Sequence, residues 1–306
     1  MDARYDVAIV GGGAAGLSAA LVLGRARRRV VVIDAGTPRN APAEHMQGFL
    51  SRDGMPPAEL LAVGRGELRG YSVELVEDEV VAADPGFTLR LAGGRALAAR
   101  RLLLATGAED VLPDIPGARE RWGKDFLHCP YCHGWEVRDR PIGVLGSDAA
   151  SVEYAHLLRQ WSDDVVFFLH AHVATAAERS LLDARGIKVV DGEVARLRIV
   201  DDRLDAVELA DGRAIPRAAL FMRPTLHARP GSLLEALGCE TDESGFARVD
   251  GNGQTTVPGV WAAGNAANPR AQVITAAGEG SAAAIAVNND LVREDVSDTL
   301  DRREFT

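Results

Sequence analysis

The chain has 306 residues, of which 47% are hydrophobic and 25% charged, and its formal net charge is −10. This composition excludes a disordered or fibrous chain, and no run is apolar for long enough to form a membrane helix. The negative charge disfavours nucleic acid or an acidic membrane as a partner. At roughly 150 residues per domain the length allows two domains, and without a targeting segment we expect a cytoplasmic protein.

The start of the chain predicts a dinucleotide-binding fold. An apolar strand, a glycine-rich turn, a helix of small residues and a second apolar strand follow one another. In the turn, Gly11 permits a tight bend, Gly13 lets the backbone approach a pyrophosphate, and Gly16 lets the helix pack on the strand. Asp34 ends the second strand, where its carboxylate can accept hydrogen bonds from ribose hydroxyls.

The remaining elements are predicted from apolar runs and turn residues. In the first half we expect a loop at 37–57, a helix at 57–69, strands at 72–76, 79–83, 87–91 and 102–105, and a domain boundary at 110–118. A second β-α-β unit then has a strand at 141–145, a helix at 152–161, strands at 164–169 and 186–190, a hairpin at 194–209 and a strand at 220–225. A strand at 260–264 leads into an Ala-rich helix at 271–291, and the charged tail 293–306 is expected to fray.

A C-x-x-C motif indicates redox chemistry. Two of the three cysteines, Cys129 and Cys132, form it. A helix that starts at such a pair stabilises a thiolate, and exchange proceeds by thiolate attack. His133 could hold a proton during that exchange. Half of a zinc site is the alternative reading, but the chain lacks a second C-x-x-C or an H-x-x-x-H, so we expect no metal. Cys239 is expected to be a buried bystander.

Two further segments extend the pattern: Ala105-Thr106-Gly107 after an apolar strand, and the run from Val257 to Asn265. With them, the whole chain resembles the low-molecular-weight thioredoxin reductase family, although Asn265 stands where that family usually has Asp. The resemblance implies an α/β fold of two Rossmann-like domains and a homodimer. A discontinuous FAD domain (1–115 and 245–306) would hold an inserted NAD(P)H-type domain (116–244) that carries the C-x-x-C.

The same resemblance assigns roles to individual residues. Cys132 would face the flavin and Cys129 would meet the substrate. The residues expected to bind FAD are Gly11, Gly13, Ala14, Ala15, Gly16, Asp34, Arg39, Asn40, Thr106, Gly107, Gly264, Asn265, Ala271, Gln272 and Val273.

The second glycine turn departs from a reductase. Only Gly146 of its three fingerprint glycines is present, with Asp148 and Ser151 at the other two positions. Asp148 adds bulk and a negative charge where the backbone should meet a pyrophosphate. The His-Arg-Arg run that clamps a 2′-phosphate in thioredoxin reductases is replaced by 170–172, His-Ala-His. We therefore expect a degenerate domain that does not use NADPH, unless Arg179 or Arg185 compensates.

These departures, with the stretch from Cys129 to Glu136, resemble the FAD-dependent dithiol oxidases of gliotoxin-, holomycin- and romidepsin-type natural products. The resemblance implies an enzyme that forms an intramolecular disulfide in a small-molecule dithiol through Cys129 and Cys132. O2 would accept the electrons and give H2O2, and His133 would be the base. An NAD(P)H-dependent thioredoxin reductase-like disulfide reductase and a non-catalytic flavin redox sensor are the alternatives.

Three aromatic residues lie near the motif: Phe126, Tyr131 and Trp135. They could form an apolar rim beside the cysteines, although aromatic residues near a motif more often pack in the core. The sequence leaves this choice open.

Overall fold

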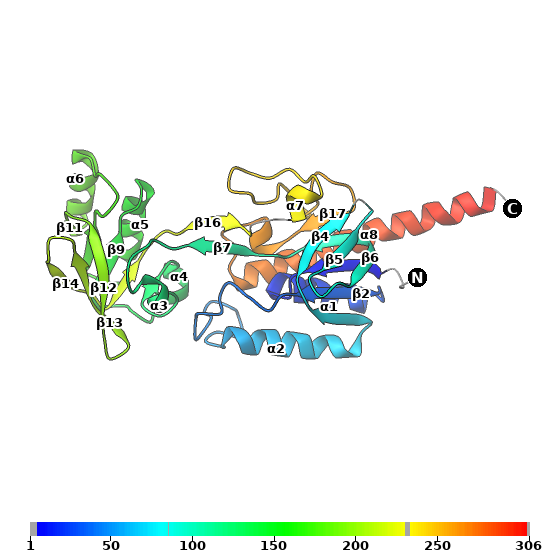
Figure 1. Ribbon diagram of the computed structural model, residues 1–306, viewed down its shortest axis with the longest axis horizontal. Coiled ribbons are helices and arrows are strands. Elements are labelled where there is room, and N and C mark those ends of the chain that lie inside the picture. Colours follow the sequence, from blue (N-terminus) through cyan, green and yellow to red (C-terminus); the bar gives the residue numbers. More distant parts are fainter. Residues whose placement is uncertain (1–4, 85, 230–232, 305–306) are drawn as a thin grey trace. The chain divides into compact units, whose positions relative to one another are not determined.

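The computed structural model describes residues 5–84, 86–229 and 233–304, so residues 1–4 and the last two residues of the expected frayed tail lie outside it. The chain divides into two compact α/β units (Figure 1). The first contains the chain up to 41, residues 57–109 and the chain from 226 onward, and the second contains 42–56 and 110–225. Within the described ranges, no helix is at once long and apolar enough to cross a bilayer.

A seven-stranded sheet forms the first unit, in the order β3-β2-β1-β6-β5-β4 with β17 also paired to β6. β1, β2, β3, β6 and β17 are parallel, whereas β4 and β5 are antiparallel to their neighbours. The strands are β1 (Tyr5–Val10), β2 (Val30–Asp34), β3 (Val73–Glu77), β4 (Val80–Asp84), β5 (Thr88–Leu91), β6 (Ala96–Leu104) and β17 (Val260–Ala262).

Two helices of the first unit pack tightly on each other. These are α1 (Ala14–Arg25) and α8 (Val273–Glu304). A Cβ on Gly280 of α8 would lie 2.1 Å from the carbonyl oxygen of Ala15, so the close approach requires glycine there. The other helical elements are α2 (Pro57–Glu67), η1 (Leu68–Gly70), α7 (Leu233–Ala236) and η2 (Gly264–Ala266).

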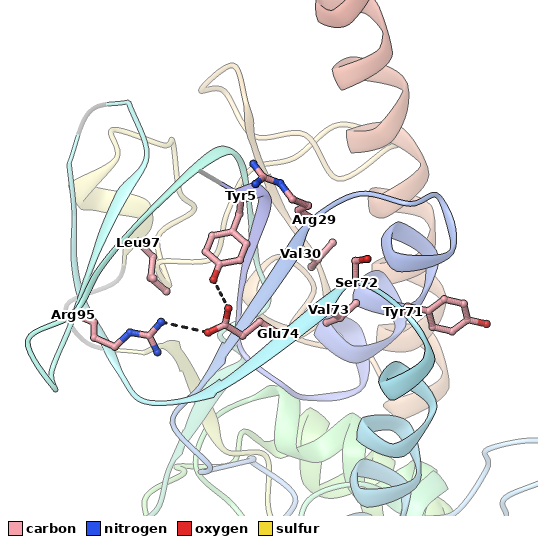
Figure 2. Close-up of a pocket in the computed structure, with 9 residues that line it drawn as sticks. All are labelled: Tyr5, Arg29, Val30, Tyr71, Ser72, Val73, Glu74, Arg95 and Leu97. Carbon is pink, nitrogen blue, oxygen red and sulfur yellow. Dashed lines mark hydrogen bonds and ion pairs between the residues drawn. The ribbon is translucent and has the colours of Figure 1, made fainter. Parts of the chain in front are cut away.

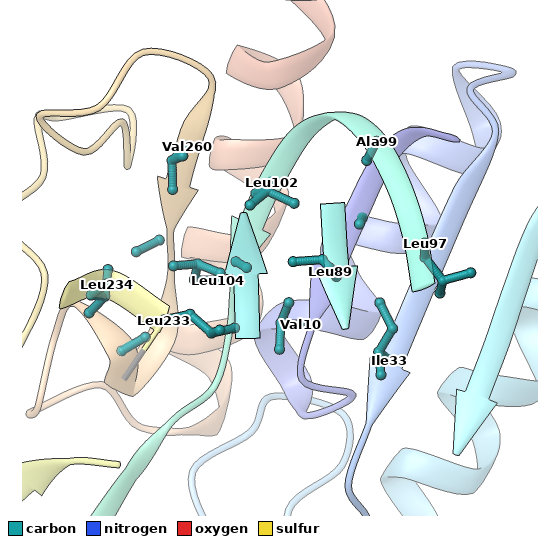
Figure 3. Packing of buried hydrophobic residues seen from close by; sticks show 14 of the residues in the cluster. Val10, Ile33, Leu89, Leu97, Ala99, Leu102, Leu104, Leu233, Leu234 and Val260 are labelled. Carbon is teal, nitrogen blue, oxygen red and sulfur yellow. The ribbon is translucent and has the colours of Figure 1, made fainter. Parts of the chain in front are cut away.

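Alternating residues of the strands divide the core of this unit into two layers. Val7 and Ile9 of β1 pack with α1 and α8, whereas Val10 packs with Leu104 and Leu89 on the other side of the sheet (Figure 3). Because the strands are buried on both faces, they are almost uninterruptedly apolar, as parallel strands usually are.

The expectation that the tail 293–306 frays is wrong for its described part, because α8 continues to Glu304. Arginines of β6 and of the turn before β2 form ion pairs with α8. Arg100 lies 2.9 Å from Glu294 and 2.5 Å from Asp295, and Arg28 lies 2.9 Å from Asp295. Charged residues that looked like a solvated tail are therefore partners of arginines far away in the sequence.

The second unit is built on a five-stranded parallel sheet in the order β11-β10-β9-β15-β8. A three-stranded antiparallel sheet, β12-β13-β14, accompanies it. The strands are β8 (Phe126–Leu127), β9 (Ile142–Leu145), β10 (Val165–Phe168), β11 (Lys188–Val190), β12 (Val194–Val200), β13 (Arg203–Leu209), β14 (Ala214–Pro216) and β15 (Ala219–Phe221). The helices are α3 (Ala118–Arg121), α4 (Pro130–His133), α5 (Ala150–Leu158) and α6 (Ala176–Ala184).

The core of the second unit also has two layers. Val165 and Phe167 of β10 pack against α5 and α6, and Val166 and Phe168 pack against β12 and β13. The two connections between the units, β7 (Ala108–Val111) and β16 (Thr225–Ala228), pair as a two-stranded sheet.

The units do not divide at the domain limits of 115/116 and 244/245 given above, but near 109/110 and 225/226. The difference at the second boundary, 225/226 instead of 244/245, is the larger one and has a clear cause. Leu233, Leu234 and Cys239 lie in the same buried cluster as Val260 of β17, so the chain has already joined the first core before residue 245. Residues 42–56, predicted only as loop, group with the second unit.

Candidate active site

The first glycine turn joins β1 to α1 and leaves the start of the helix open. Gly11 has a φ of 107°, and a Cβ there would lie 2.2 Å from the carbonyl oxygen of Ala105. A Cβ on Gly16 would lie 1.9 Å from the carbonyl oxygen of Gly11. At Gly13, in contrast, a Cβ would meet nothing within 4 Å, and no described side chain caps the helix there. Free N–H groups beside open space suit a phosphate group.

The carboxylate of Asp34 lies beside this turn, as the sequence predicts. A Cβ on Gly12 would lie 2.6 Å from Asp34 Oδ2, so the turn and the carboxylate are in contact. Asp34 Oδ2 also accepts a hydrogen bond from Arg65 Nη2 of α2 at 2.7 Å. The sequence analysis missed Arg65, because no motif or spacing distinguishes this arginine from others on the helix surface.

The loop after β6 closes another side of the glycine turn. A Cβ on Gly11 would lie 3.2 Å from the backbone nitrogen of Thr106, and Gly107 has a φ of 77° with open space where a Cβ would point. The structure therefore brings the loop that contains Thr106 and Gly107 to the turn of β1. Asn40, another expected cofactor residue, lies half-buried in the loop after β2.

A polar network surrounds Asn265 between β17 and α8. Arg39 Nη1 donates to Asn265 Oδ1 at 3.3 Å, and Asn265 Nδ2 donates to the carbonyl oxygens of Asn268 and Ala271, at 2.9 and 3.1 Å. Gln272 and Val273 follow directly at the start of α8. The network therefore holds Arg39, Asn265 and Ala271 together, and its amide and guanidinium groups could bind the polar end of a flavin.

Glu279 of α8 accepts hydrogen bonds from this network, and the sequence analysis also missed it. Its carboxylate accepts hydrogen bonds from the backbone N–H of Gly264 at 3.0 Å and from Asn268 Nδ2 at 2.6 Å. The sequence carried a signal for it, since Glu279 is the one ionisable residue between 271 and 289.

The two cysteines of the motif form a disulfide at the start of α4, with 5.2 Å between their Cα atoms. Cys129 is the N-cap, and its carbonyl oxygen accepts hydrogen bonds from the N–H groups of Cys132 and His133, both at 3.1 Å. This tight turn follows β8, and Tyr154 of α5 donates a hydrogen bond to the carbonyl oxygen of His128 just before it. The third cysteine, Cys239, is buried and outside this site, as the sequence predicts.

His133 is the titratable residue that directly follows the second cysteine in the chain. Burial lowers its pKa from the ordinary 6.5, and the nearby charge of Glu136 only partly offsets the effect. At neutral pH the ring is therefore uncharged. A neutral imidazole can accept a proton from a thiol.

In the second glycine turn, between β9 and α5, the side chain of Asp148 lies at the start of the helix. Asp148 Oδ1 accepts hydrogen bonds from the backbone N–H and the hydroxyl of Ser151, both at 2.9 Å. Arg223 Nη1 lies 3.7 Å from the same oxygen. A carboxylate thus occupies the helix start, where a pyrophosphate would otherwise be stabilised by the same N–H group.

The residues that could compensate for the missing phosphate clamp have partners within the protein. Arg179 Nη2 lies 2.6 Å from Asp191 Oδ1, and Arg185 Nη2 donates to the carbonyl oxygen of His156 at 3.3 Å. Of the two histidines at the clamp position, His170 Nδ1 accepts a hydrogen bond from the backbone N–H of Val194 at 3.1 Å, and burial lowers its pKa. The other, His172, lies 3.3 Å from the carboxylate of Glu178.

A cavity of about 570 Å³ lies elsewhere in the first unit (Figure 2). Tyr5, Val30 and Val73, the first residues of β1, β2 and β3, line it, so it lies at the opposite strand ends from the glycine turn. The hydroxyl of Tyr5 and the guanidinium of Arg95 both contact Glu74 there (Figure 2). None of the predicted site residues lines this cavity.

Comparison with known proteins agrees with this geometry. A family model described as pyridine nucleotide-disulphide oxidoreductase matches residues 5–280. Thioredoxin reductase sirT of Leptosphaeria maculans is 31% identical, over 96% of each chain. Thioredoxin reductase tcpT of Claviceps purpurea is 34% identical over 85% of this chain and 86% of its own. The crystal structure of HlmI superposes with a TM-score of 0.96 at 52% identity, covering 100% of this chain and 99% of HlmI.

Proposed function

Because the chain belongs to the pyridine nucleotide-disulphide oxidoreductase family, we propose that it is an FAD-dependent dithiol oxidase. The family and the α/β fold predicted from the sequence are confirmed, and the protein is a flavin-dependent oxidoreductase, which sets aside the non-catalytic sensor. The proposed reaction closes an intramolecular disulfide in a small-molecule dithiol, with O2 as acceptor and H2O2 as product. The observation that carries the proposal is that Asp148 fills the second glycine turn, while the first is open.

The first unit offers a site that suits FAD. Gly13 and the start of α1 would receive the pyrophosphate, Asp34 the ribose, and the network around Asn265 the flavin end. When bound, FAD supplies the two-electron acceptor that returns the cysteine pair to the disulfide and passes the electrons to O2.

The cysteines perform the exchange with the substrate. A substrate thiolate attacks Cys129, so that a mixed disulfide forms and Cys132 leaves as a thiolate. The second substrate thiol then attacks the sulfur of the first, the product disulfide leaves, and Cys129 is released as a thiolate. Two electrons have moved from the substrate to the cysteine pair. The neutral imidazole of His133 takes up a proton released by the substrate thiols.

The reductase alternative has some support, because relatives at 31% and 34% identity are named thioredoxin reductases. It requires NADPH to bind the second unit. Three features oppose this: the Asp148 carboxylate in the turn, and the internal partners of Arg179 and Arg185. The cytoplasmic location, expected from the sequence, and the homodimer, implied by the family resemblance, both stay predictions.

Oxygen consumption tests the proposal. With a small dithiol and no NADPH, the FAD-loaded enzyme should consume one O2 and release one H2O2 for each disulfide formed. Cys129→Ser and Cys132→Ser should abolish turnover while retaining FAD. Cys239→Ser is the matched control and should keep full activity, because Cys239 is buried outside the site. Turnover that depends on NADPH, or that survives in Cys129→Ser, would contradict the proposal.

A further inference from the structure

Two large aromatic side chains close to the cysteine pair in the chain are exposed to solvent. Tyr131 lies between the two cysteines in the chain and is 66% exposed, and Trp135 is 65% exposed. Phe126, the third aromatic residue near the motif, is fully buried in the parallel sheet. The structure thus separates one core residue from two residues that face outward.

Both open rings are held in position by neighbours. The ring of Tyr131 meets Trp161 edge-on, with 5.6 Å between centroids. Trp161 also packs on Gly134, where a Cβ would lie 2.9 Å from the indole. The turn after α4 is therefore fixed against Trp161, and its backbone N–H at Asp139 donates to the carbonyl oxygen of Trp161 at 2.8 Å.

The guanidinium group of Arg138 packs on the ring of Trp135 and fixes its position. The guanidinium carbon of Arg138 lies 3.9 Å from the centroid of the Trp135 ring, and Arg138 Nη1 donates to the carbonyl oxygen of Trp135 at 2.7 Å. The ring remains largely exposed despite this contact. A positioned aromatic ring with a flat cation beside it attracts a π-face and an anionic group such as a thiolate.

We infer that Tyr131 and Trp135 form a binding platform for the substrate, and that the platform favours a small, flat, π-bearing dithiol over a saturated one. The inference rests on the proposed function and specifies its substrate class. Tyr131 lies in α4, and Trp135 follows directly after its C-cap, Gly134, so both residues belong to one short turn of chain. Tyr131 lies between the two cysteines in the chain and Trp135 three residues after Cys132, so the platform belongs to the segment that carries the reacting sulfurs.

The size of the platform favours a small molecule over a protein substrate. The other exposed large hydrophobic side chains described in the second unit are aliphatic: Leu50, Val111, Val173, Leu181, Ile199 and Val200. Tyr131 and Trp135 are the two aromatic ones among them. A stable protein interface buries about 800 Å² on each partner, far more than two rings provide.

A matched pair of dithiols tests the inference. One is ortho-bis(mercaptomethyl)benzene, and the other is its cyclohexane analogue, which closes a disulfide ring of the same size. Anaerobic reduction of the flavin in the FAD-loaded enzyme should be about fivefold more efficient with the aromatic compound. Trp135→Leu and Tyr131→Leu should each reduce that preference to about twofold or less, mainly by slowing reduction by the aromatic compound. Trp135→Phe should retain most of it.

Binding of the closed disulfides, measured by calorimetry on the oxidised enzyme, provides a readout independent of turnover. The aromatic disulfide should bind more tightly than the saturated one, and Trp135→Leu should remove the difference. Val173→Ala, which truncates an 88% exposed apolar side chain of the same unit, should change neither reduction nor binding.

Each alternative result has a distinct meaning. Equal efficiency and equal affinity for the two compounds in every variant would overturn the platform while leaving the oxidase proposal intact. Reduction of the flavin by a reduced thioredoxin-like protein but by neither small dithiol would replace the platform with a protein-docking site. Failure of every thiol to reduce the flavin, with the binding preference preserved, would overturn the proposed function and retain the platform.

Discussion

The Asp148 carboxylate should keep a nicotinamide dinucleotide out of the second unit, and two substitutions separate its charge from its capping role. Asp148→Asn keeps an oxygen that can accept the two hydrogen bonds from Ser151 but removes the charge. Asp148→Gly removes both and restores the second glycine of the fingerprint. Replacing an acidic cap with glycine costs only a few tenths of a kcal/mol, so Asp148→Gly should lower the melting temperature by less than about 1 °C and Asp148→Asn should leave it unchanged.

Loss of the charge should strengthen NADPH binding. Two like charges about 5 Å apart near a protein surface repel by a few kcal/mol before solvent screening, and Asp148 is more than half exposed. We therefore expect about a tenfold lower dissociation constant for NADPH in both variants, measured by calorimetry on the oxidised holoenzyme. Asp163→Asn, which removes a 99% exposed carboxylate of the same unit, is the control for net charge. Micromolar NADPH affinity in the wild type, or equal NADPH affinities of the wild type and both variants, would refute this reasoning.

Three other predictions concern the base, the cofactor network and the long helix. His133→Gln should slow flavin reduction by dithiol about 100-fold in stopped flow; in the wild type the rate should fall as the pH drops below 6.5 and the neutral imidazole becomes protonated. Glu279→Ala leaves two donors without their acceptor, so the FAD-to-protein absorbance ratio after dialysis should show about tenfold weaker retention. Arg28 and Arg100 hold the pKa of Asp295 below 3.8, so its stabilising effect is complete above that pH and is lost as the pH falls through the lowered value. Urea unfolding of Asp295→Asn should show a loss of less than about 1 kcal/mol at neutral pH, which shrinks in acid.

Elements that depend on local patterns were predictable from the sequence. The turn at Gly11, the strand that ends at Asp34 and the cysteine pair all follow from residue types at short spacing, and the structure brings the first two into contact through Gly12. Asp148 was recognisable as a misfit in a fingerprint. Its hydrogen bonds to Ser151 were not, because a fingerprint describes backbone geometry and says nothing of what a substituted side chain does.

Features that depend on long-range contacts were not predictable. Arg65 contacts Asp34 across 31 residues, and Arg100 contacts Asp295 across 195. The helix continues past that second contact, so its charged composition alone was misleading. Likewise, only the burial of Phe126 and the exposure of Tyr131 and Trp135 distinguish core from surface among three similar residues.

The direction of electron flow is tested most directly by anaerobic titration of the FAD-loaded enzyme while the flavin absorbance is followed. A small dithiol should bleach the flavin, NADPH and NADH should leave it oxidised, and admission of air should restore the colour and release H2O2. Bleaching by NADPH within the time of one turnover would contradict the account and identify the protein as a reductase.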